Sequence, residues 1–240
     1  GGLRRYARGK ISSLNHRNGL SDENVIALCE DRGGSLWVGT SAGGLNQISS
    51  GPFRTYQFGR TPSENMIWSI RGDREGALWF GTQSGIIRRK AERSEWYRLG
   101  DSQDVWNYWS FGSCVDGALL AAHSSGKIYC IRQGQAELAV DIHQFIRCVF
   151  TDSRGRTWIG GLNGLLRMER GAIVQDPLSD SLAGKEIESL LETRNGRLLI
   201  STNKGIYSLG TKGFGKVLFR NGRLDEIVHA MIEDREGAIW

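Results

Sequence analysis

The chain has 240 residues, of which 39% are hydrophobic and 24% are charged, and its formal net charge is +5. These values are typical of a globular protein that buries a core. No run of 18 apolar residues occurs, so the sequence predicts no membrane insertion. The lysines and arginines are scattered and no nucleic-acid-binding motif accompanies them, which argues against nucleic acid as a partner.

The first repeat contains four short strand-like segments. An apolar segment at 25–28 precedes the turn sequence Asp-Arg-Gly-Gly at 31–34, and Leu-Trp-Val-Gly-Thr follows at 36–40. Segments 44–49 and 53–58 complete the repeat. β-branched and aromatic residues favour strands. Asp-x-x-Gly favours a turn, because the carboxylate accepts local backbone N–H groups and glycine adopts backbone conformations that are closed to other residues.

This pattern recurs along the whole chain. One Trp or Leu, called the marker here, recurs every 38 to 42 residues: Trp37, Trp79, Leu120, Trp158, Leu199 and Trp240. Six positions earlier stand Asp31, Asp73, Cys114, Asp152, Thr193 and Asp234. Three positions earlier a glycine stands in all six copies. A period near 40 with four strands per copy is that of a propeller blade. We therefore predict an all-β fold, a β-propeller of four-stranded antiparallel blades with about six repeats over residues 1–240.

The first strand of each repeat is predicted to lie nearest the propeller axis. The residue ten positions before the marker is small in every copy: Ala27, Ser69, Ser110, Cys148, Ser189 and Ala230. Converging blades leave little space near the axis, which favours small side chains. The chain begins and ends within a blade, so we expect part of a seven-bladed ring or of a longer tandem array. A closed six-bladed ring is the alternative.

The recurring Asp, Gly and Trp residues are predicted to be structural, with each Trp filling the space between neighbouring blades. The four cysteines, at 29, 114, 130 and 148, lack metal-ligand spacing, and we predict no metal site and no cofactor. Cys29 and Cys148 are predicted to be buried. One disulfide is possible, but its pairing stays open.

Ligand binding is expected where the repeats differ, in the loops that lead into the first strands and at the position eleven before the marker. That position is mixed: Ile26, Trp68, Trp109, Arg147, Glu188 and His229. The candidate ligand-binding residues are Asn24, Asn65, Trp68, Trp106, Asn107, Trp109, Gln144, Arg147 and His229. In the third repeat, Trp106 and Trp109 are predicted to offer a stacking platform for a sugar ring or another planar ligand. Tyr108 and Phe111 fall at core positions.

The stretch NGLSDENVIALCEDRGGSLWVGTSAGGLNQI at 18–48 resembles the two-component regulator propeller repeat. The resemblance implies an extracytoplasmic sensor region of a membrane-bound bacterial receptor, which binds a small molecule or an oligosaccharide and is dimeric in the parent protein. A histidine kinase or diguanylate cyclase would lie outside this chain, which would itself have no catalytic residues.

Two alternatives stay open. The first is a scaffold that binds other proteins. The second is a sialidase-like glycan-processing propeller, since the stretch 152–158 is similar to a sialidase Asp-box and Tyr108, Arg147 and Glu188 supply residue types used there.

Overall fold

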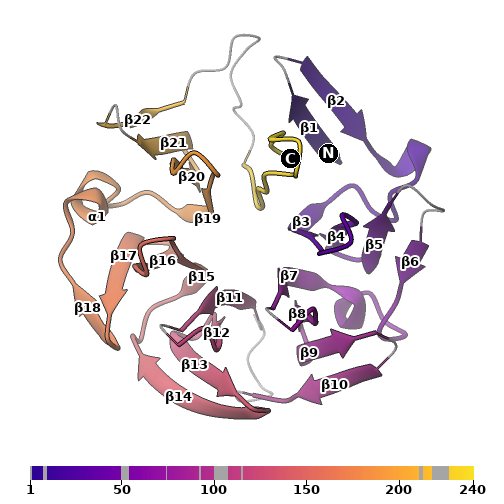
Figure 1. Ribbon diagram of the computed structural model, residues 1–240, viewed down its shortest axis with the longest axis horizontal. Helices are drawn as coiled ribbons and strands as arrows, with labels where there is room; N and C mark the ends of the chain where they lie inside the picture. The colour runs from indigo at the N-terminus through magenta and orange to yellow at the C-terminus, as the bar shows by residue number, and fades with distance from the viewer. Residues whose placement is uncertain are drawn as a thin grey trace. The chain divides into compact units, whose positions relative to one another are not determined.

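A computed structural model describes residues 2–7, 10–49, 54–73, 75–91, 93–99, 108–114, 116–210, 213–217 and 227–240. The chain forms two compact units: Gly1–Trp109 with Ala230–Trp240, and Ser110–His229. The described residues form five four-stranded antiparallel sheets, each with its strands in chain order (Figure 1). The predicted all-β propeller of four-stranded antiparallel blades is therefore confirmed, whereas the predicted number of about six such blades is wrong.

The first unit contains two of these blades and a two-stranded sheet. The two-stranded sheet consists of β1 (Leu3–Ala7) and β2 (Lys10–Leu14). Blade 1 consists of β3 (Val25–Glu30), β4 (Leu36–Thr40), β5 (Leu45–Ile48) and β6 (Arg54–Tyr56). Blade 2 consists of β7 (Ile67–Gly72), β8 (Leu78–Thr82), β9 (Gly85–Lys90) and β10 (Arg93–Tyr97). Short 3₁₀ helices, η1 (His16–Asn18) and η2 (Ser63–Asn65), precede the two blades.

The second unit contains three blades. Blade 3 consists of β11 (Trp109–Ser113), whose first residue belongs to the first unit, β12 (Leu119–His123), β13 (Lys127–Arg132) and β14 (Gln135–Asp141). Blade 4 consists of β15 (Ile146–Thr151), β16 (Thr157–Gly161), β17 (Gly164–Glu169) and β18 (Ala172–Val174). Blade 5 consists of β19 (Ile187–Glu192), β20 (Leu198–Thr202), β21 (Gly205–Gly210) and β22 (Gly213–Lys216), preceded by helix α1 (Pro177–Ser181).

The described residues of the sixth copy of the repeat do not form a four-stranded sheet of their own. Its C-terminal segment pairs instead with the N-terminal strand β1, where the Tyr6 N–H donates to the Ile239 carbonyl (2.8 Å) and the Ile239 N–H donates to the Tyr6 carbonyl (3.1 Å). Among the described residues, the copy that ends at Trp240 therefore contributes one isolated bridge to the edge of the β1–β2 sheet, Tyr6 to Ile239, and one within its own segment, Glu233 to Ile239. This arrangement accounts for the difference between six sequence copies and five complete blades.

The Asp turn has the same hydrogen bonds in the repeats that keep both Asp and Trp. In blade 1 the Asp31 carboxylate accepts the Ser35 N–H (2.9 Å) and the Trp37 indole N–H (2.7 Å). The same indole bond recurs in three further copies: Trp79 to Asp73, Trp158 to Asp152, and Trp240 to Asp234. The glycine of the turn has φ between 75° and 83° in all six copies, a region that other residues rarely adopt. The turn prediction is confirmed, and its glycine is required by backbone conformation.

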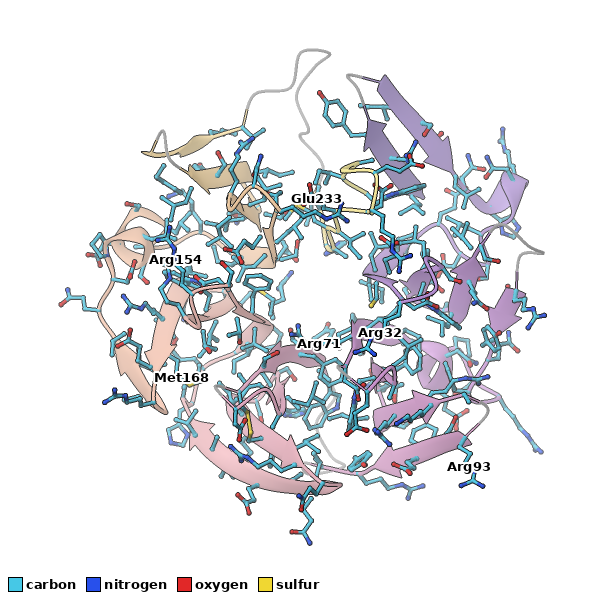
Figure 2. The ribbon with its side chains drawn as sticks, viewed as in Figure 1. Arg32, Arg71, Arg93, Arg154, Met168 and Glu233 are labelled. Carbon is cyan, nitrogen blue, oxygen red and sulfur yellow. A yellow bond between two sulfur atoms is a disulfide. The ribbon has the colours of Figure 1, made fainter. Side chains whose placement is uncertain are left out.

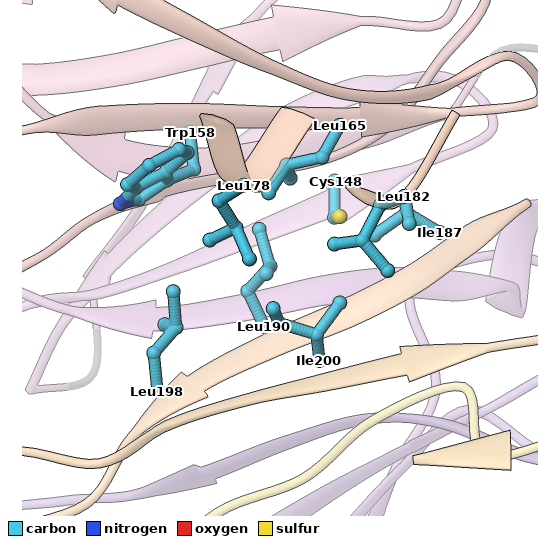
Figure 3. Close-up of a cluster of buried hydrophobic side chains, with 9 residues drawn as sticks. All are labelled: Cys148, Trp158, Leu165, Leu178, Leu182, Ile187, Leu190, Leu198 and Ile200. Carbon is cyan, nitrogen blue, oxygen red and sulfur yellow. The ribbon is translucent and has the colours of Figure 1, made fainter. Parts of the chain in front are cut away.

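The space between adjacent blades is filled by the marker residues and their neighbours. The outermost strands carry exposed side chains, such as Arg93 of β10 (Figure 2). In contrast, Trp158 is fully buried in a cluster that joins blade 4 to Leu190, Leu198 and Ile200 of blade 5 (Figure 3). Trp37 likewise packs with Phe80 of blade 2, with ring centroids 6.4 Å apart. For these two residues the prediction that each Trp fills the space between blades is confirmed.

The first strands of adjacent blades approach closely, β3 against β7 and β15 against β19. Gly160 of β16 shows how little space remains between blades 4 and 5. A Cβ at this position would lie 2.6 Å from both the Cys148 Sγ and the Ile187 side chain, which is too close for any substitution without movement. Steric limits of this kind explain why the position ten before the marker carries only small residues.

Blade 3 replaces the Asp–Trp pair with a disulfide. Its turn keeps the backbone bonds, since the Cys114 N–H donates to the Ala118 carbonyl (2.8 Å). Cys114 stands in place of Asp and forms a disulfide with Cys130 of β13, which lies opposite Leu120, the residue in place of Trp. The disulfide therefore ties the turn to the third strand. The remaining two cysteines, Cys29 and Cys148, are free, and both are buried as predicted.

Trp79→Ala is expected to lower the free energy of unfolding by about 3–5 kcal/mol. Trp79 is only 5% exposed, so the change leaves a buried cavity, and it also removes the hydrogen bond to Asp73. Denaturant unfolding measures the effect. Trp96→Ala is the matched control, because Trp96 of β10 is 46% exposed, and it should cost less than about 1 kcal/mol. Equal effects of the two changes would contradict the packing role of Trp79.

Replacing both Cys114 and Cys130 with serine is expected to lower the free energy of unfolding by about 3 kcal/mol, as loop closure over 16 residues predicts. A thiol reductant should lower the melting temperature of the wild-type chain and leave that of the double variant unchanged. Thiol titration shows whether the reductant has opened the disulfide. If the disulfide is open and the melting temperature of the wild-type chain is unchanged, the disulfide has no stabilising role.

Candidate functional site

In four blades the residue eleven positions before the marker occupies a β-bulge in the first strand. In blade 1, Val25 pairs with Thr40 and Ala27 pairs with Gly39, which leaves Ile26 without a cross-strand partner. The same register shift occurs in three other blades, at Trp68, Arg147 and Glu188. A bulge frees one residue from the ladder and re-aims its side chain. This geometry explains why the position varies between repeats while the positions beside it do not.

Three of these side chains form a charged cluster in the second unit, called the Arg–Glu–His cluster here: Arg147 of β15, Glu188 of β19 and His229. The Arg147 guanidinium donates through Nη1 to Glu188 Oε1 (2.5 Å), and His229 Nδ1 lies 3.2 Å from Glu188 Oε2. Both carboxylate oxygens of Glu188 are therefore engaged, one on each side. The three residues come from equivalent positions of successive repeats, so the repeat itself brings them together.

The Glu188 carboxylate is held in its charged form. Its side chain is only 1% exposed, and this burial by itself raises the pKa. The hydrogen bonds from His229 and Arg147, and their charges, outweigh burial and hold the pKa of Glu188 below its ordinary value. The cluster is therefore a buried ionic centre whose two outer members reach the surface, Arg147 at 32% and His229 at 37% exposed.

The backbone that carries His229 is anchored by two serine hydroxyls. Ser201 Oγ donates to the Val228 carbonyl at 2.7 Å, and Ser189 Oγ lies 3.5 Å from the same oxygen. Ser189 is also one of the small residues of the first strands. The histidine therefore projects from a fixed backbone, and Glu188 fixes its ring.

The Arg–Glu–His cluster has donors left over for a ligand. Arg147 Nε is buried and has no hydrogen-bond partner among the residues that the structure describes, and its Nη2 lies 3.8 Å from Glu186 Oε2. The contact of His229 with Glu188 uses Nδ1, which leaves Nε2 of the ring for another partner. Arg147 and His229 are two part-exposed side chains held rigidly on either side of one carboxylate, and they suit recognition of a polar ligand rich in hydroxyl or carboxylate oxygens.

In blade 2, which belongs to the first unit, the bulged residue is the aromatic Trp68. Trp68 meets Tyr108 edge-on, with ring centroids 3.9 Å apart and an interplanar angle of 78°. Trp109, predicted as half of a stacking platform, is 1% exposed and lies in the core, where a Cβ on Gly81 would come within 2.6 Å of it. A ligand in solvent does not reach Trp109 in this conformation. Its predicted companion Trp106 lies outside the described residues.

The other predicted ligand residues are placed separately. Asn24 and Gln144 are exposed, and Asn107 lies outside the described residues. Asn65 is buried, and its side-chain amide makes four hydrogen bonds to loop backbone, accepting from Phe58 and Gly59 and donating to Gly59 and Thr61. Asn65 therefore shapes the loop before β7. Of the predicted residues that the structure describes, Arg147 and His229 are brought together, through Glu188.

Glu188 was not among the predicted ligand residues, although it stands at the mixed position. The sequence feature that could have selected Glu188 is its position midway between Arg147 and His229, 41 residues from each. Arg147 and Glu188, two residue types considered for a sialidase-like site, bind each other. Tyr108 of the same set lies against Trp68 in the first unit.

One group in the second unit has the geometry to hold a metal ion: Cys114, Asp116 and Cys130 have ligand atoms within 4.8 Å of one another. Both sulfurs are joined in the disulfide, and the Asp116 carboxylate accepts a hydrogen bond from Arg132 Nε (2.7 Å). The donors of this group are committed to one another and to Arg132, so its role in this structure is to stabilise blade 3.

Comparison with known proteins points to one family. The family described as "Two component regulator propeller" matches residues 19–42 and 61–84. No curated protein sequence matches the chain. The fold resembles the extracellular domain of a protein assigned as a hybrid two component system from B. thetaiotaomicron, with a TM-score of 0.72 and 18% identity over 100% of this chain and 34% of that chain.

Two further solved structures are similar. Another extracellular domain assigned to a hybrid two component system of B. thetaiotaomicron has a TM-score of 0.59 and 16% identity over 90% of this chain and 36% of that chain. Catalytically inactive virginiamycin B lyase from Staphylococcus aureus, with quinupristin, has a TM-score of 0.69 and 14% identity over 97% of this chain and 84% of that chain. The chain thus spans about a third of the two-component extracellular domains. At these identities the likeness shows the propeller fold alone.

Glu188→Gln is expected to destabilise the chain by about 3 kcal/mol at pH 7, because it removes the buried carboxylate that Arg147 Nη1 binds. A carboxyl whose folded pKa is lowered contributes stability that is present above its unfolded pKa, near 4.5, and is lost as pH falls through the folded pKa. The difference in unfolding free energy between wild type and Glu188→Gln should therefore shrink below about pH 4.5 in urea titrations.

The control for this experiment is Glu137→Gln, on the exposed side of β14, which should match the wild type at every pH. If the difference in unfolding free energy between the wild type and Glu188→Gln stays constant from pH 7 to pH 3, the ionic role of Glu188 is refuted.

Proposed function

Since the chain carries repeats of the two component regulator propeller family, we propose that it is an extracytoplasmic ligand-sensing region of a membrane-bound bacterial signal-transduction receptor. Two similar structures are extracellular domains of proteins assigned to two component systems, which supports this placement. The Cys114–Cys130 disulfide also supports it, because disulfides persist in oxidising compartments. Among the described residues, no helix has the length and apolar character needed to cross a membrane.

The Arg–Glu–His cluster carries the ligand-binding part of the proposal. It places charged side chains at bulged positions, where the repeats vary, and it leaves Arg147 and His229 partly exposed. Glu188 holds both of them in fixed orientations, and such preorganisation lowers the entropy cost of binding. A small molecule or oligosaccharide with several oxygen acceptors is the proposed ligand.

Signalling would follow from a shift between two states of the receptor. A ligand changes such an equilibrium only by its difference in affinity for the two states. In the proposed receptor the propeller region binds the ligand, the parent protein is a dimer, and a histidine kinase or diguanylate cyclase elsewhere in the parent responds. The chain itself supplies recognition and no catalytic step.

Binding can be tested with the 240-residue chain and a panel of neutral oligosaccharides, acidic oligosaccharides and dicarboxylates. Thermal shift finds the compounds that bind, and calorimetry measures their affinities. Arg147→Gln and His229→Gln should each weaken the binding of such a compound by about tenfold, the effect of losing one hydrogen bond to a charged group. Both changes lie at the edge of the cluster and keep Glu188 in place.

His143→Gln is the matched control, because the His143 side chain is 85% exposed and contacts Asp141. It should leave affinity unchanged. If a compound binds and its affinity is the same in wild type, Arg147→Gln and His229→Gln, the cluster is not the binding site.

The outer strands favour a second candidate, a scaffold that binds other proteins. Each of four blades exposes a large apolar side chain on its outermost strand: Trp96, Leu138, Ile173 and Phe214, between 37% and 54% exposed. Exposed apolar residues of this kind mark protein contacts when they cluster. Alanine at Leu138 and Ile173 should abolish the capture of a protein partner and spare small-molecule binding, which separates the two candidates.

A further inference from the structure

β10 is the outermost strand of blade 2 (Figure 1), and its C-terminal end borders a cavity of about 320 Å³. The lining comes from the loop between β6 and β7, the turn between β8 and β9, and the end of β10: Phe58, Glu64, Ser84, Trp96 and Arg98. All of these residues belong to the first unit. A volume of this size is at the lower end of the range of small-molecule sites.

The aromatic wall of the cavity consists of Trp96 and Phe58. Trp96 lies opposite Ile87 of β9, which lies opposite Phe80 of β8, so these three side chains form a row on one face of blade 2. Phe58 packs on Phe80, with ring centroids 5.6 Å apart. Phe80 and Ile87 are fully buried, whereas Trp96 is 46% exposed. The cavity therefore lies where this apolar row reaches the surface.

The blade fold does not require an aromatic side chain at the end of this row. In three other blades, the row that starts one residue after the marker ends in other residue types: Thr55, Leu138 and Lys216. Within the part of the chain that the structure describes, no hydrogen bond or ring contact engages the Trp96 indole. Its exposed face is available to a ligand.

Arg98 supplies a positive charge to the same cavity. Successive side chains along a strand point to opposite faces, so Arg98 projects on the side of Trp96, while Tyr97 packs on Trp79 with ring centroids 5.3 Å apart. Arg98 is exposed, and among the described residues its guanidinium has no hydrogen-bond or ion-pair partner.

Glu64 supplies a negative charge from a rigid loop. Its Oε2 accepts the backbone N–H groups of Arg60 (2.8 Å) and Thr61 (2.9 Å) and the Thr61 hydroxyl (2.9 Å). The hydrogen bonds from Thr61 and then from Arg60 hold the pKa of Glu64 below its ordinary value, so the carboxylate is charged at neutral pH. Among the described residues, the second oxygen, Oε1, has no donor.

Arg98 and Glu64 therefore line one cavity without forming an ion pair with each other. A ligand with one charge alone would be attracted by one of these groups and repelled by the other. A zwitterion satisfies both, and the aromatic wall adds affinity for a flat apolar group. These three features together are those of an aromatic amino acid.

We propose that this cavity binds a free aromatic α-amino acid. Arg98 pairs with its carboxylate through the planar guanidinium fork, Glu64 accepts hydrogen bonds from its ammonium group, and the aromatic wall packs on its side chain. The site belongs to the first unit, whereas the Arg–Glu–His cluster belongs to the second. It is therefore a separate site and goes beyond the proposed function.

Phenylalanine is the probe for this site, and two relatives each lack one of its charges. Hydrocinnamate lacks the ammonium group, and phenethylamine lacks the carboxylate. Calorimetry on the 240-residue chain should show phenylalanine binding with a dissociation constant of about 1 mM or lower. Each relative should bind at least about tenfold more weakly, the effect of losing one charged hydrogen-bonding group.

Variants test which side chain binds which charge. Arg98→Gln should weaken phenylalanine binding about tenfold and leave phenethylamine binding unchanged. Glu64→Gln should weaken phenylalanine binding similarly and leave hydrocinnamate binding unchanged, since glutamine keeps an oxygen that accepts from the loop N–H groups. Trp96→Ala should weaken the binding of all three compounds.

The matched controls are Arg93→Gln and Glu95→Gln, which remove the same charges from β10 outside the cavity lining and should bind phenylalanine like the wild type. Circular dichroism checks that every variant folds. If Glu64→Gln does not fold, Arg98→Gln decides the question, because among the described residues the Arg98 side chain makes no hydrogen bond or ion pair that the change would break.

Three results would overturn the proposal: no phenylalanine binding by the wild-type chain, binding of hydrocinnamate or phenethylamine as tight as that of phenylalanine, or wild-type phenylalanine affinity in Arg98→Gln. Arg147→Gln should leave phenylalanine binding unchanged, and Arg98→Gln should leave binding at the Arg–Glu–His cluster unchanged. Failure of this site and failure of the proposed sensing function can therefore be distinguished.

Discussion

The carboxylate of the Asp turn makes two kinds of hydrogen bond at once, to backbone N–H groups of its own turn and to the indole of the Trp six residues later. These bonds fix where the second strand starts and how its Trp is oriented. The Trp of blade 4 then packs against blade 5, and that of blade 1 against blade 2. A local bond between residues six apart therefore sets the contact between neighbouring blades. This explains why Asp and Trp occur together in four copies.

The exceptions to this pairing show what the fold requires. Blade 3 lacks both Asp and Trp and joins its turn to the third strand covalently. Blade 5 has Thr193 and Leu199, and the Thr193 hydroxyl accepts the Arg197 N–H within the turn. The glycine of the turn is present in both. What every blade keeps is the backbone shape of the turn, whereas the link from the turn to a strand can be an indole hydrogen bond or a disulfide.

Spacing and residue type along the chain were sufficient to predict the four-stranded blades, the turns and the buried small residues, because each depends on contacts within one repeat or between adjacent repeats. The number of complete blades was not predictable in the same way. It depends on the pairing of Ile239 with Tyr6, which joins the two ends of the chain. The Cys114–Cys130 pairing required the turn geometry of blade 3. The candidate site was predicted in part, since Arg147 and His229 were selected, but Glu188 between them was not. Glu188 is a charged residue at a position whose meaning depends on a bulge that spacing alone does not reveal.

The bulge in the first strands of blades 1, 2, 4 and 5 has a consequence for how such a protein can change. A bulged residue has no cross-strand partner, so replacing Ile by Trp, Arg or Glu at that position leaves the ladder hydrogen bonds on either side intact. The strand register is fixed by its neighbours. Each of these four blades therefore offers one position where side-chain chemistry can diversify during evolution, or be redesigned, with little effect on the architecture. A set of repeats that shares one skeleton can in this way acquire a binding surface in which every blade contributes a different group.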